Sequence, residues 1–305
     1  MAESVETTFV VGGRKVAARL CLPAAAGPVP GVVLVDGSGP GDRLEFEREQ
    51  GWFADAGLAS LAYDKPGCGT TPGDWRCQIF ADRAAEAAAG VDHLIEHPAV
   101  APDRIGLWGA SQGGWVVPLA AGRHHGIAFT ILVSAPAVTP YEQEAASLMQ
   151  RMRAAGEADD AIERASAVQD ELVEMLRGGS RGEAVAARYR RRATDPAVAY
   201  VYKELFADPT VAEFVAGIGD HDPIPALERL RCPVLAVFGA RDTYIPVDES
   251  VRLMTEAFER GGNDDVTILV LPDADHGLRT NADGGLHPDY VPTMTAWLRP
   301  RVGLA

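Results

Sequence analysis

The chain has 305 residues, of which 47% are hydrophobic and 23% are charged, a composition typical of a globular protein and not of a disordered or fibrous one. Its formal net charge is −15, and so negative a surface repels phosphate backbones, so we expect no nucleic-acid partner. No apolar run approaches the roughly 18 residues of a membrane span, and the first residues lack the basic and apolar segments of a signal peptide. We therefore expect a cytoplasmic protein that makes no membrane contact.

The predicted elements begin with two strands, over residues 5–11 and 15–22, that turn at Gly12-Gly13. After them, apolar stretches typical of strands buried on both faces alternate with helical patterns. Strands are expected at 31–37, 58–64, 104–108 and 127–135, and helices at 46–57, 77–97 and 114–125, the last weakened by Pro118. This alternation predicts an α/β fold with a mostly parallel central sheet flanked by helices on both faces.

The alternation stops between Thr139 and Arg229, where the sequence is rich in Glu, Ala and Arg with helical spacing. An insertion of about ninety residues is longer than ordinary connections between strands. The earlier pattern then resumes with a strand at 232–240, a helix at 247–259, a strand at 266–272 and a helix at 289–299. We expect a discontinuous core domain of residues 1–138 and 230–305, with residues 139–229 forming a helical cap that acts as a lid over the site.

The cysteines and one basic segment test whether the chain binds a metal or an anion. The four cysteines are scattered without a Cys-x-x-Cys pair, which argues against a disulfide framework and a zinc site, and we expect no metal and no cofactor. The segment RYRRR, residues 188–192, is basic in an acidic chain. We interpret it as a solvated helix face, with a contact to an anionic substrate or partner as the alternative.

The segment GLWGASQGGWVV, residues 106–117, places Ser111 in a Gly-x-Ser-x-Gly pattern. In a glycine-rich chain this pattern also arises by chance, so its structural context decides its meaning. An apolar strand precedes it and a helix follows it, which is the strand–turn–helix context of a nucleophile elbow. The alternative is a glycine-rich turn that contains an inert serine.

A serine nucleophile needs a histidine to accept its proton and an acid to orient the imidazole. Asp242 follows the strand at 232–240 and His276 follows the strand at 266–272, so both are expected at the sheet edge that carries Ser111. Each has a simpler interpretation, Asp242 as a cap of a turn or helix and His276 as a loop residue. The order along the chain favours a Ser111-Asp242-His276 triad, with His287 as the alternative base.

The tetrahedral intermediate of acyl transfer also needs hydrogen-bond donors for its oxyanion. One is expected to be the amide of Gln112, directly after the nucleophile and at a helix N-terminus. The other is expected from the glycine-rich loop VDGSGPGDR, residues 35–43, where we assign the amide of Ser38 with Gly37 as the alternative. This loop has neither the glycine spacing nor the Gly-Lys-Ser/Thr of a phosphate-binding loop.

Together these segments resemble the α/β-hydrolase superfamily, and most closely its bacterial esterase and serine-aminopeptidase-like branch, with dienelactone-hydrolase-like members nearby. The resemblance covers residues 5–138 and 230–299 and is carried by DGSGPGDR, YDKPGCGTT, GASQGG, GARDTYIP and DADHG. It implies an α/β-hydrolase fold in which the insertion occupies the position of the family's cap.

Two departures from relatives matter. Asp36-Gly37 stands where many have His-Gly, which places a negative charge near the oxyanion loop. Ser111 is neither the Cys of dienelactone hydrolases nor the Asp of haloalkane dehalogenases and epoxide hydrolases, which excludes those two chemistries.

The function expected from this set is hydrolysis of a small carboxylic ester through an acyl-enzyme on Ser111. The alternatives are a thioesterase, a lactonase or an aminopeptidase with the same triad, or a non-hydrolytic member that acts on a biosynthetic intermediate. We expect a small-molecule acyl substrate, and the residues assigned to contact it are Gly37, Trp115, Tyr141 and Tyr244. The sequence does not fix the oligomeric state, and a homodimer is one possible state.

Overall fold

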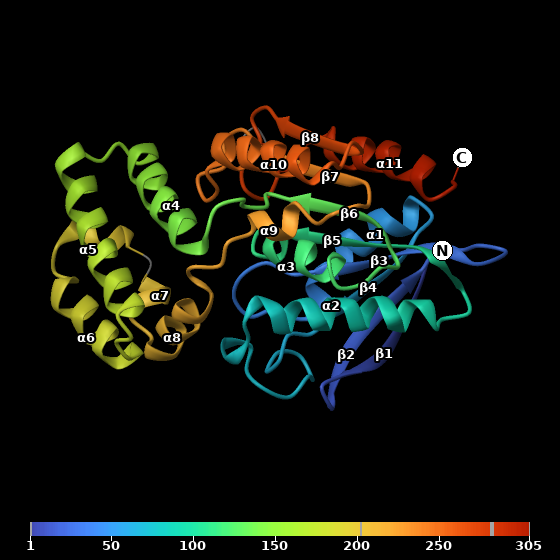
Figure 1. The fold of residues 1–305 in the computed structure, drawn as a ribbon, viewed down its shortest axis with the longest axis horizontal. Coiled ribbons are helices and arrows are strands. Elements are labelled where there is room, and N and C mark those ends of the chain that lie inside the picture. Colours follow the sequence, from blue (N-terminus) through green and yellow to red (C-terminus); the bar gives the residue numbers. More distant parts are fainter. Residues whose placement is uncertain (1, 202, 281–283, 305) are drawn as a thin grey trace.

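An eight-stranded sheet forms the centre of the computed structural model, which describes residues 2–201, 203–280 and 284–304 (Figure 1). The strands lie in the order β1-β2-β4-β3-β5-β6-β7-β8, and β2 runs antiparallel to both of its neighbours while the strands from β4 to β8 run parallel. Their bounds are β1 Glu3–Val11, β2 Arg14–Leu22, β3 Val29–Val35, β4 Ala59–Tyr63, β5 Val100–Ala110, β6 Ile127–Val133, β7 Val234–Gly239 and β8 Val266–Leu271. The α/β class and the mostly parallel sheet predicted from the sequence are confirmed.

Helices cover both faces of this sheet. Successive side chains of a strand point to opposite faces, so Val33 of β3 packs in one core cluster and Val32 in another. The first cluster is completed by α2 (Phe80–Ile95), α3 (Gly113–Ala121) and α10 (Val247–Gly261), and the second by α1 (Glu47–Asp55) and α11 (Tyr290–Arg301). Burial on both faces explains why the central strands read as continuous apolar runs instead of alternating ones.

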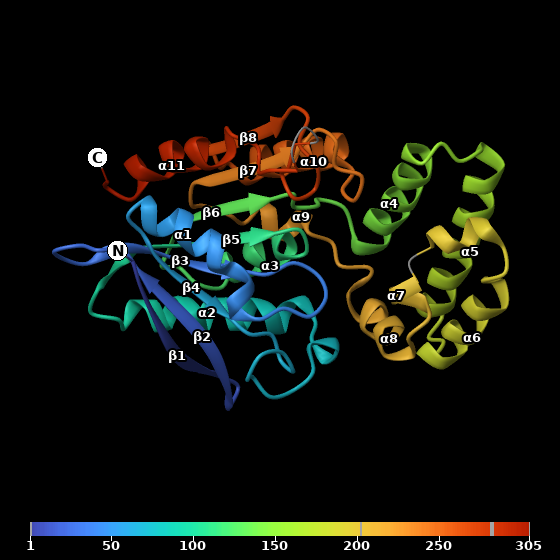
Figure 2. The same cartoon turned by 180° about the vertical axis from the view of Figure 1, so that it is seen from behind.

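The segment between β6 and β7 is helical, as the sequence predicts, and lies beside the sheet edge at which the parallel strands end (Figures 1 and 2). Thr139 begins it with a capping box, in which its Oγ1 accepts from the Glu142 amide at 3.3 Å and Glu142 Oε2 accepts from the Thr139 amide at 2.8 Å. The helices are α4 Pro140–Ala154, α5 Asp159–Arg177, α6 Gly182–Arg192, α7 Lys203–Phe206, α8 Pro209–Ile218 and α9 Ile224–Leu227. Because α9 contacts α10 and α3, the chain has returned to the sheet by Ile224. The lid role stays a prediction.

Several helix ends differ from the prediction. The helix expected at 77–97 begins at Phe80 and ends at Ile95. The helix expected at 114–125 ends at Ala121, where Gly122 follows, and the last helix continues through Pro300 to Arg301. A proline is tolerated there because it removes only one hydrogen bond of the final turn.

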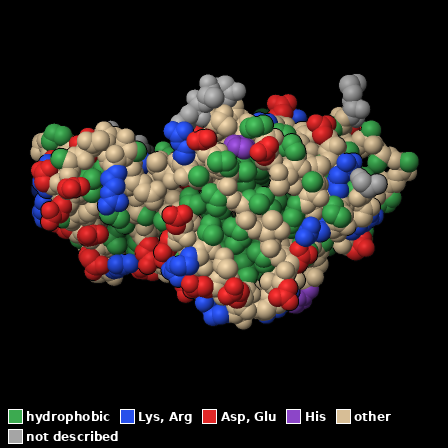
Figure 3. Space-filling model, turned by 90° about the horizontal axis from the view of Figure 1, so that it is seen from above, with side chains coloured by type: hydrophobic (Ala, Val, Ile, Leu, Met, Phe, Trp, Pro, Cys, Tyr) green, Lys and Arg blue, Asp and Glu red, His purple; other side chains and the backbone are tan. Residues whose placement is uncertain are grey.

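The surface carries charged side chains of both signs (Figure 3). The basic cluster lies on α6 and two of its arginines, Arg188 and Arg192, bind Glu171 of α5. Charged side chains of both signs surround the face drawn in Figure 3, and apolar ones gather at its centre. No helix in the described part of the chain is both long and apolar enough to span a membrane.

Candidate active site

Ser111 lies in the turn between β5 and α3. Its φ of 51° is a left-handed conformation that strains a residue with a side chain and is concentrated at functional turns. Its amide donates to the carbonyl oxygen of Val133 at 2.8 Å. Both flanking glycines are required, because a Cβ at Gly113 would lie 2.6 Å from the carbonyl oxygen of Val35, and one at Gly109 would lie 2.8 Å from that of Gly113. The turn has the geometry of a nucleophile elbow.

Asp242 and His276 follow β7 and β8 and are hydrogen-bonded to each other. The Asp242 side chain is fully buried and accepts from His276 Nδ1 at 2.8 Å and from the amides of Tyr244 and Ile245 at 2.7 and 3.0 Å. Because a carboxylate only accepts, Nδ1 of His276 carries a proton, and in the neutral imidazole Nε2 then keeps a lone pair. This is the tautomer that a general base requires.

The end of β6 holds Ser111 and His276 near each other. The Ser111 amide binds the carbonyl oxygen of Val133, and the hydroxyl of the next residue, Ser134, donates to the carbonyl oxygen of His276 at 2.8 Å. Strands β5, β6, β7 and β8 are consecutive in the sheet, so the loops after them meet at one edge. The structure therefore brings Ser111, Asp242 and His276 together, as their order along the chain predicts.

The loop after β3 packs against Ser111, because a Cβ at Gly37 would lie 3.5 Å from Ser111 Cβ. The Gly37 amide already donates to Asp36 Oδ1 at 2.7 Å. This contact leaves the amide of Ser38 as the candidate oxyanion donor from the loop. Gln112 is the N-cap residue of α3, and both Ser38 and Gln112 line the cavity that Ser111 lines.

Lys65 balances the negative charge of Asp36. Its Nζ lies 2.9 Å from Asp36 Oδ2 and donates to the carbonyl oxygens of Gly37 and Gly39 at 2.8 and 2.6 Å. Burial, and then the charge of Arg83, lower the pKa of Lys65 to about 8, while Asp36 opposes that shift. The Asp36 carboxylate beside the candidate oxyanion loop is thus paired in the folded protein.

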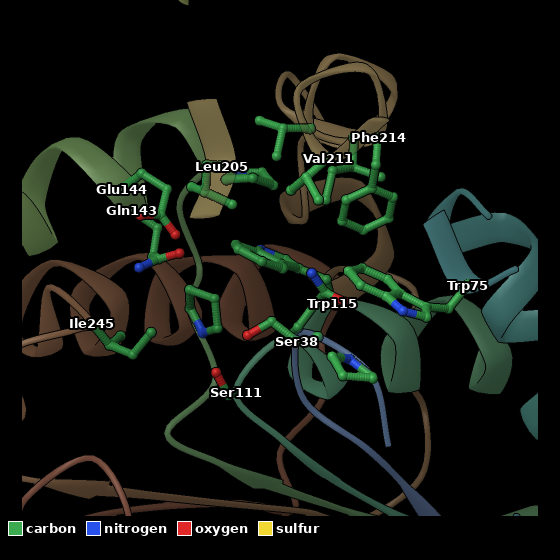
Figure 4. Close-up of a pocket in the computed structure, with 17 residues that line it drawn as sticks. Ser38, Trp75, Ser111, Trp115, Gln143, Glu144, Leu205, Val211, Phe214 and Ile245 are labelled. Carbon is green, nitrogen blue, oxygen red and sulfur yellow. The ribbon is translucent and has the colours of Figure 1, made fainter. Parts of the chain in front are cut away.

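A cavity of about 320 Å³ lies between Ser111 and the inserted helices (Figure 4). Gln143 and Glu144 of α4 supply polar side chains to its wall. The rest of the wall is mainly apolar, with side chains from the core and from α7 and α8, namely Trp75, Trp115, Leu205, Val211, Phe214, Val215, Ile218 and Ile245. A concave, largely apolar site of this size suits a small organic group.

Glu144 is an ionisable side chain in this apolar wall. Its Oε2 is buried and has no hydrogen-bond partner among the described residues. Burial raises the pKa of Glu144 to about 7, and the positive charge of Arg151 only partly opposes this. A buried carboxyl oxygen without a partner is costly, and a ligand that donates a hydrogen bond would satisfy it.

Three of the residues expected to contact substrate lie at or near the cavity. Trp115 lines it, with its indole Nε1 donating to the carbonyl oxygen of Val138 at 3.0 Å. The Tyr244 ring is 5.2 Å from the His276 ring, outside the cavity wall. Gly37 lies behind Ser111 and does not line the cavity either.

Tyr141 and His287 make structural contacts instead. Tyr141 is buried on α4 beneath the guanidinium of Arg177, 5.0 Å from the ring centroid. His287 precedes α11, where its Nδ1 accepts from the Asp289 amide at 3.2 Å. Neither lines the cavity, and His276, not His287, binds Asp242.

Sequence reasoning does not find Lys65, Arg83 or Glu144. Lys65 lies inside the quoted turn YDKPGCGTT, where a lysine among apolar and glycine residues is a weak signal of a buried cation. Arg83 lies in an alanine-rich helix and Glu144 in a helix with other charged residues, and nothing in their spacing separates them from solvated neighbours.

The fold and this site define an α/β-hydrolase with a serine at the nucleophile position. Residues 43–283 match the model of the family described as serine aminopeptidase, S33, and the chain belongs to that family.

Esterase EstD of Thermotoga maritima is 24% identical over 278 residues, which are 88% of this chain and 59% of EstD, so the chain spans about three fifths of that relative. The structure of DcsB in complex with its substrate analogue superposes with a TM-score of 0.65 and 20% identity over 99% of both chains. Proline iminopeptidase of Mycobacterium smegmatis superposes with a TM-score of 0.64 and 19% identity over 97% of this chain and 98% of its own. The structural similarity shows the shared fold.

Proposed function

We propose that this protein is a serine hydrolase that cleaves small, largely apolar carboxylic esters. The observation that carries the proposal is that Ser111 lines an apolar cavity, while the hydrogen-bonded Asp242–His276 pair lies in the loops at the same edge of the sheet. The similarity to esterase EstD supports an ester as the substrate.

In the proposed first step, Ser111 Oγ attacks the acyl carbon while His276 Nε2 takes its proton. The negative charge on the former carbonyl oxygen is stabilised by the amides of Ser38 and Gln112. The C–O bond of the ester then breaks, and the departing alkoxide takes the proton from His276. The product of this half-reaction is an acyl-enzyme on Ser111.

Hydrolysis of the acyl-enzyme reverses the same proton transfers. Water attacks the acyl carbon while His276 accepts a proton, and the carboxylic acid leaves as that proton returns to Ser111 Oγ. Asp242 stays ionised throughout, holds Nδ1–H and stabilises the imidazolium. Its two backbone donors, the amides of Tyr244 and Ile245, fix its orientation.

Glu144 favours a second candidate, an aminopeptidase, because a carboxylate in the cavity wall is suited to a substrate ammonium group. The family description and the fold shared with proline iminopeptidase support the same candidate. We rank it second because Glu144 is a single carboxyl group in a wall that is otherwise apolar, and its raised pKa of about 7 weakens its charge near neutrality. Thioesters and lactones need the same Ser111 chemistry and are distinguished only by assay.

The deciding experiment compares kcat/KM for para-nitrophenyl esters, acyl thioesters, lactones and amino-acid para-nitroanilides. We expect the esters to be turned over fastest and Ser111→Ala to abolish all turnover, whereas Ser166→Ala, on α5 and away from the cavity, keeps it. Faster cleavage of an anilide than of every ester would make the aminopeptidase the better proposal. Full turnover by Ser111→Ala would refute both.

A further inference from the structure

Two cations, Lys65 and Arg83, are buried beside the candidate oxyanion loop, with 3% of the Lys65 side chain and 4% of Arg83 exposed. Burying a cation is costly unless it is paired and hydrogen-bonded. Their contacts therefore show which part of the molecule the two side chains hold in place.

Lys65, in the turn after β4, binds the loop at three points. Its Nζ contacts the carboxylate of Asp36 at 2.9 Å and the carbonyl oxygens of Gly37 and Gly39 at 2.8 and 2.6 Å. The two carbonyl contacts lie on either side of Ser38, the residue whose amide is the candidate donor. One ammonium group thus fixes the peptide planes that flank Ser38.

Arg83 of α2 joins this loop to the other side of the site. One guanidinium nitrogen donates to the carbonyl oxygen of Asp36 at 2.6 Å, and the other donates to Oε1 of Gln112 at 2.5 Å. Gln112 follows the nucleophile and carries the second candidate donor amide. A single planar side chain therefore bridges the loop after β3 and the side chain of the residue that follows the nucleophile.

The carboxylate of Asp36 is in contact with the Gly41 backbone as well as with Lys65. A Cβ at Gly41 would lie 1.8 Å from Asp36 Oδ2, so Asp36 packs directly on the Gly41 backbone. The Gly41 carbonyl oxygen accepts from the Lys65 amide at 3.1 Å. The loop closes around the ion pair.

We propose that Lys65 and Arg83 are positioning residues that hold the amides of Ser38 and Gln112 in the arrangement that binds the oxyanion, and that this arrangement requires Lys65 to be charged. The inference rests on the function proposed above. A neutral Lys65 leaves Asp36 as an unpaired anion beside the point where negative charge develops, and it also weakens the two carbonyl contacts. Deprotonation of Lys65 thus slows attack by Ser111 without removing any reacting group.

The charged and titratable groups that face Lys65 are Asp36 after β3, Arg83 of α2 and Cys68 in its own turn. Burial is the largest cause of the lowered Lys65 pKa of about 8, against an ordinary value of 10.5. The reaction rate is therefore expected to fall as the pH rises through about 8. Over that same window the contribution of Lys65 to folding stability rises, because the unfolded chain keeps a proton that the folded protein has released. Alkaline loss of activity through Lys65 is thus separable from unfolding.

The test measures the second-order rate constant for phosphonylation of Ser111 by a fluorophosphonate, between about pH 6 and pH 10, with the melting temperature beside it. We expect the wild-type rate to fall above pH 8 and Lys65→Arg, whose cation does not titrate, to lose that fall. Lys65→Met is expected to react about ten- to a hundredfold more slowly at neutral pH, because the amides that bind the oxyanion are no longer held in place. Arg14→Met is the matched control, because it removes a cation from the buried Glu86 of α2 without touching the loop.

The outcomes separate the two proposals. A wild-type protein that forms no adduct contradicts the proposed function. An adduct formed equally fast by wild type and Lys65→Met, or an alkaline fall that persists in Lys65→Arg, contradicts the positioning role. If Lys65→Met does not fold, the comparison of wild type with Lys65→Arg still decides. Arg14→Met is expected to react at the wild-type rate, and an Arg14→Met as slow as Lys65→Met would mean that loss of any paired cation slows the reaction, which also contradicts the positioning role.

Discussion

Replacing Asp242 with Asn tests the His276 tautomer with little change in shape. The Asn oxygen can still accept from the amides of Tyr244 and Ile245, at 2.7 and 3.0 Å in the wild type, so the loop is expected to keep its fold. The other position, 2.8 Å from His276 Nδ1, then carries an NH₂ group that only donates. Nδ1 of His276 must then accept a hydrogen bond from this NH₂ group, so the imidazole proton moves to Nε2. A protonated Nε2 cannot accept the proton of the Ser111 hydroxyl. We expect kcat to fall about 10³- to 10⁴-fold, or about 4 to 5 kcal/mol of transition-state stabilisation.

The assay is kcat for para-nitrophenyl butyrate, with the melting temperature measured in parallel. Asp264→Asn, at an exposed site before β8, is the control for the change of charge and is expected to behave as wild type. A folded Asp242→Asn variant with kcat within tenfold of wild type would refute the role given to the Asp242–His276 pair.

Three further changes test the site and its surroundings. Because burial raises the pKa of Glu144 to about 7, the wild type loses at most about 3 kcal/mol of stability as the pH rises from 4.5 to 7. In denaturant unfolding, Glu144→Gln should therefore match wild type below pH 4.5 and exceed it above pH 7, and a pH-independent difference would contradict this. Phe214→Ala removes part of the apolar cavity wall at a distance from the reacting bond. It should raise KM for the hexanoate ester about tenfold and leave kcat little changed. A tenfold fall in kcat would count against a role of Phe214 in binding. Gly113→Ala places a Cβ 2.6 Å from the carbonyl oxygen of Val35 and should lower the free energy of unfolding by about 1 to 3 kcal/mol, whereas Gly51→Ala, with nothing within 4 Å, should not lower it.

The sequence predicts much of this fold because Ser111, Asp242 and His276 each follow an apolar strand, and parallel strands end at one edge. The order of strands and helices along the chain is enough to predict that these three residues lie at one edge, and the side-chain packing between the elements is not needed. Tyr141 shows the limit, because helical spacing does not reveal whether an aromatic ring faces a cavity or packs under Arg177.

The positions of Lys65 and Arg83 cannot be predicted from the sequence either, because both side chains bind backbone atoms. Lys65 follows β4 and Arg83 lies on α2, yet both bind backbone oxygens of the loop after β3. Contacts with backbone atoms leave no pattern in the sequence of the partner segment. A carboxylate at Asp36, in the glycine-rich loop expected to bind the oxyanion, indicates from the sequence that a cation compensates its charge, but not which cation does so.

The central claim is that Ser111 is a nucleophile activated by His276, and intact-mass analysis after fluorophosphonate treatment tests it most directly. We expect one adduct, mapped to Ser111, that is absent in Ser111→Ala and strongly slowed in His276→Ala but unchanged in His125→Ala. A folded wild-type protein without an adduct, or with one that forms as fast in His276→Ala, would contradict the claim.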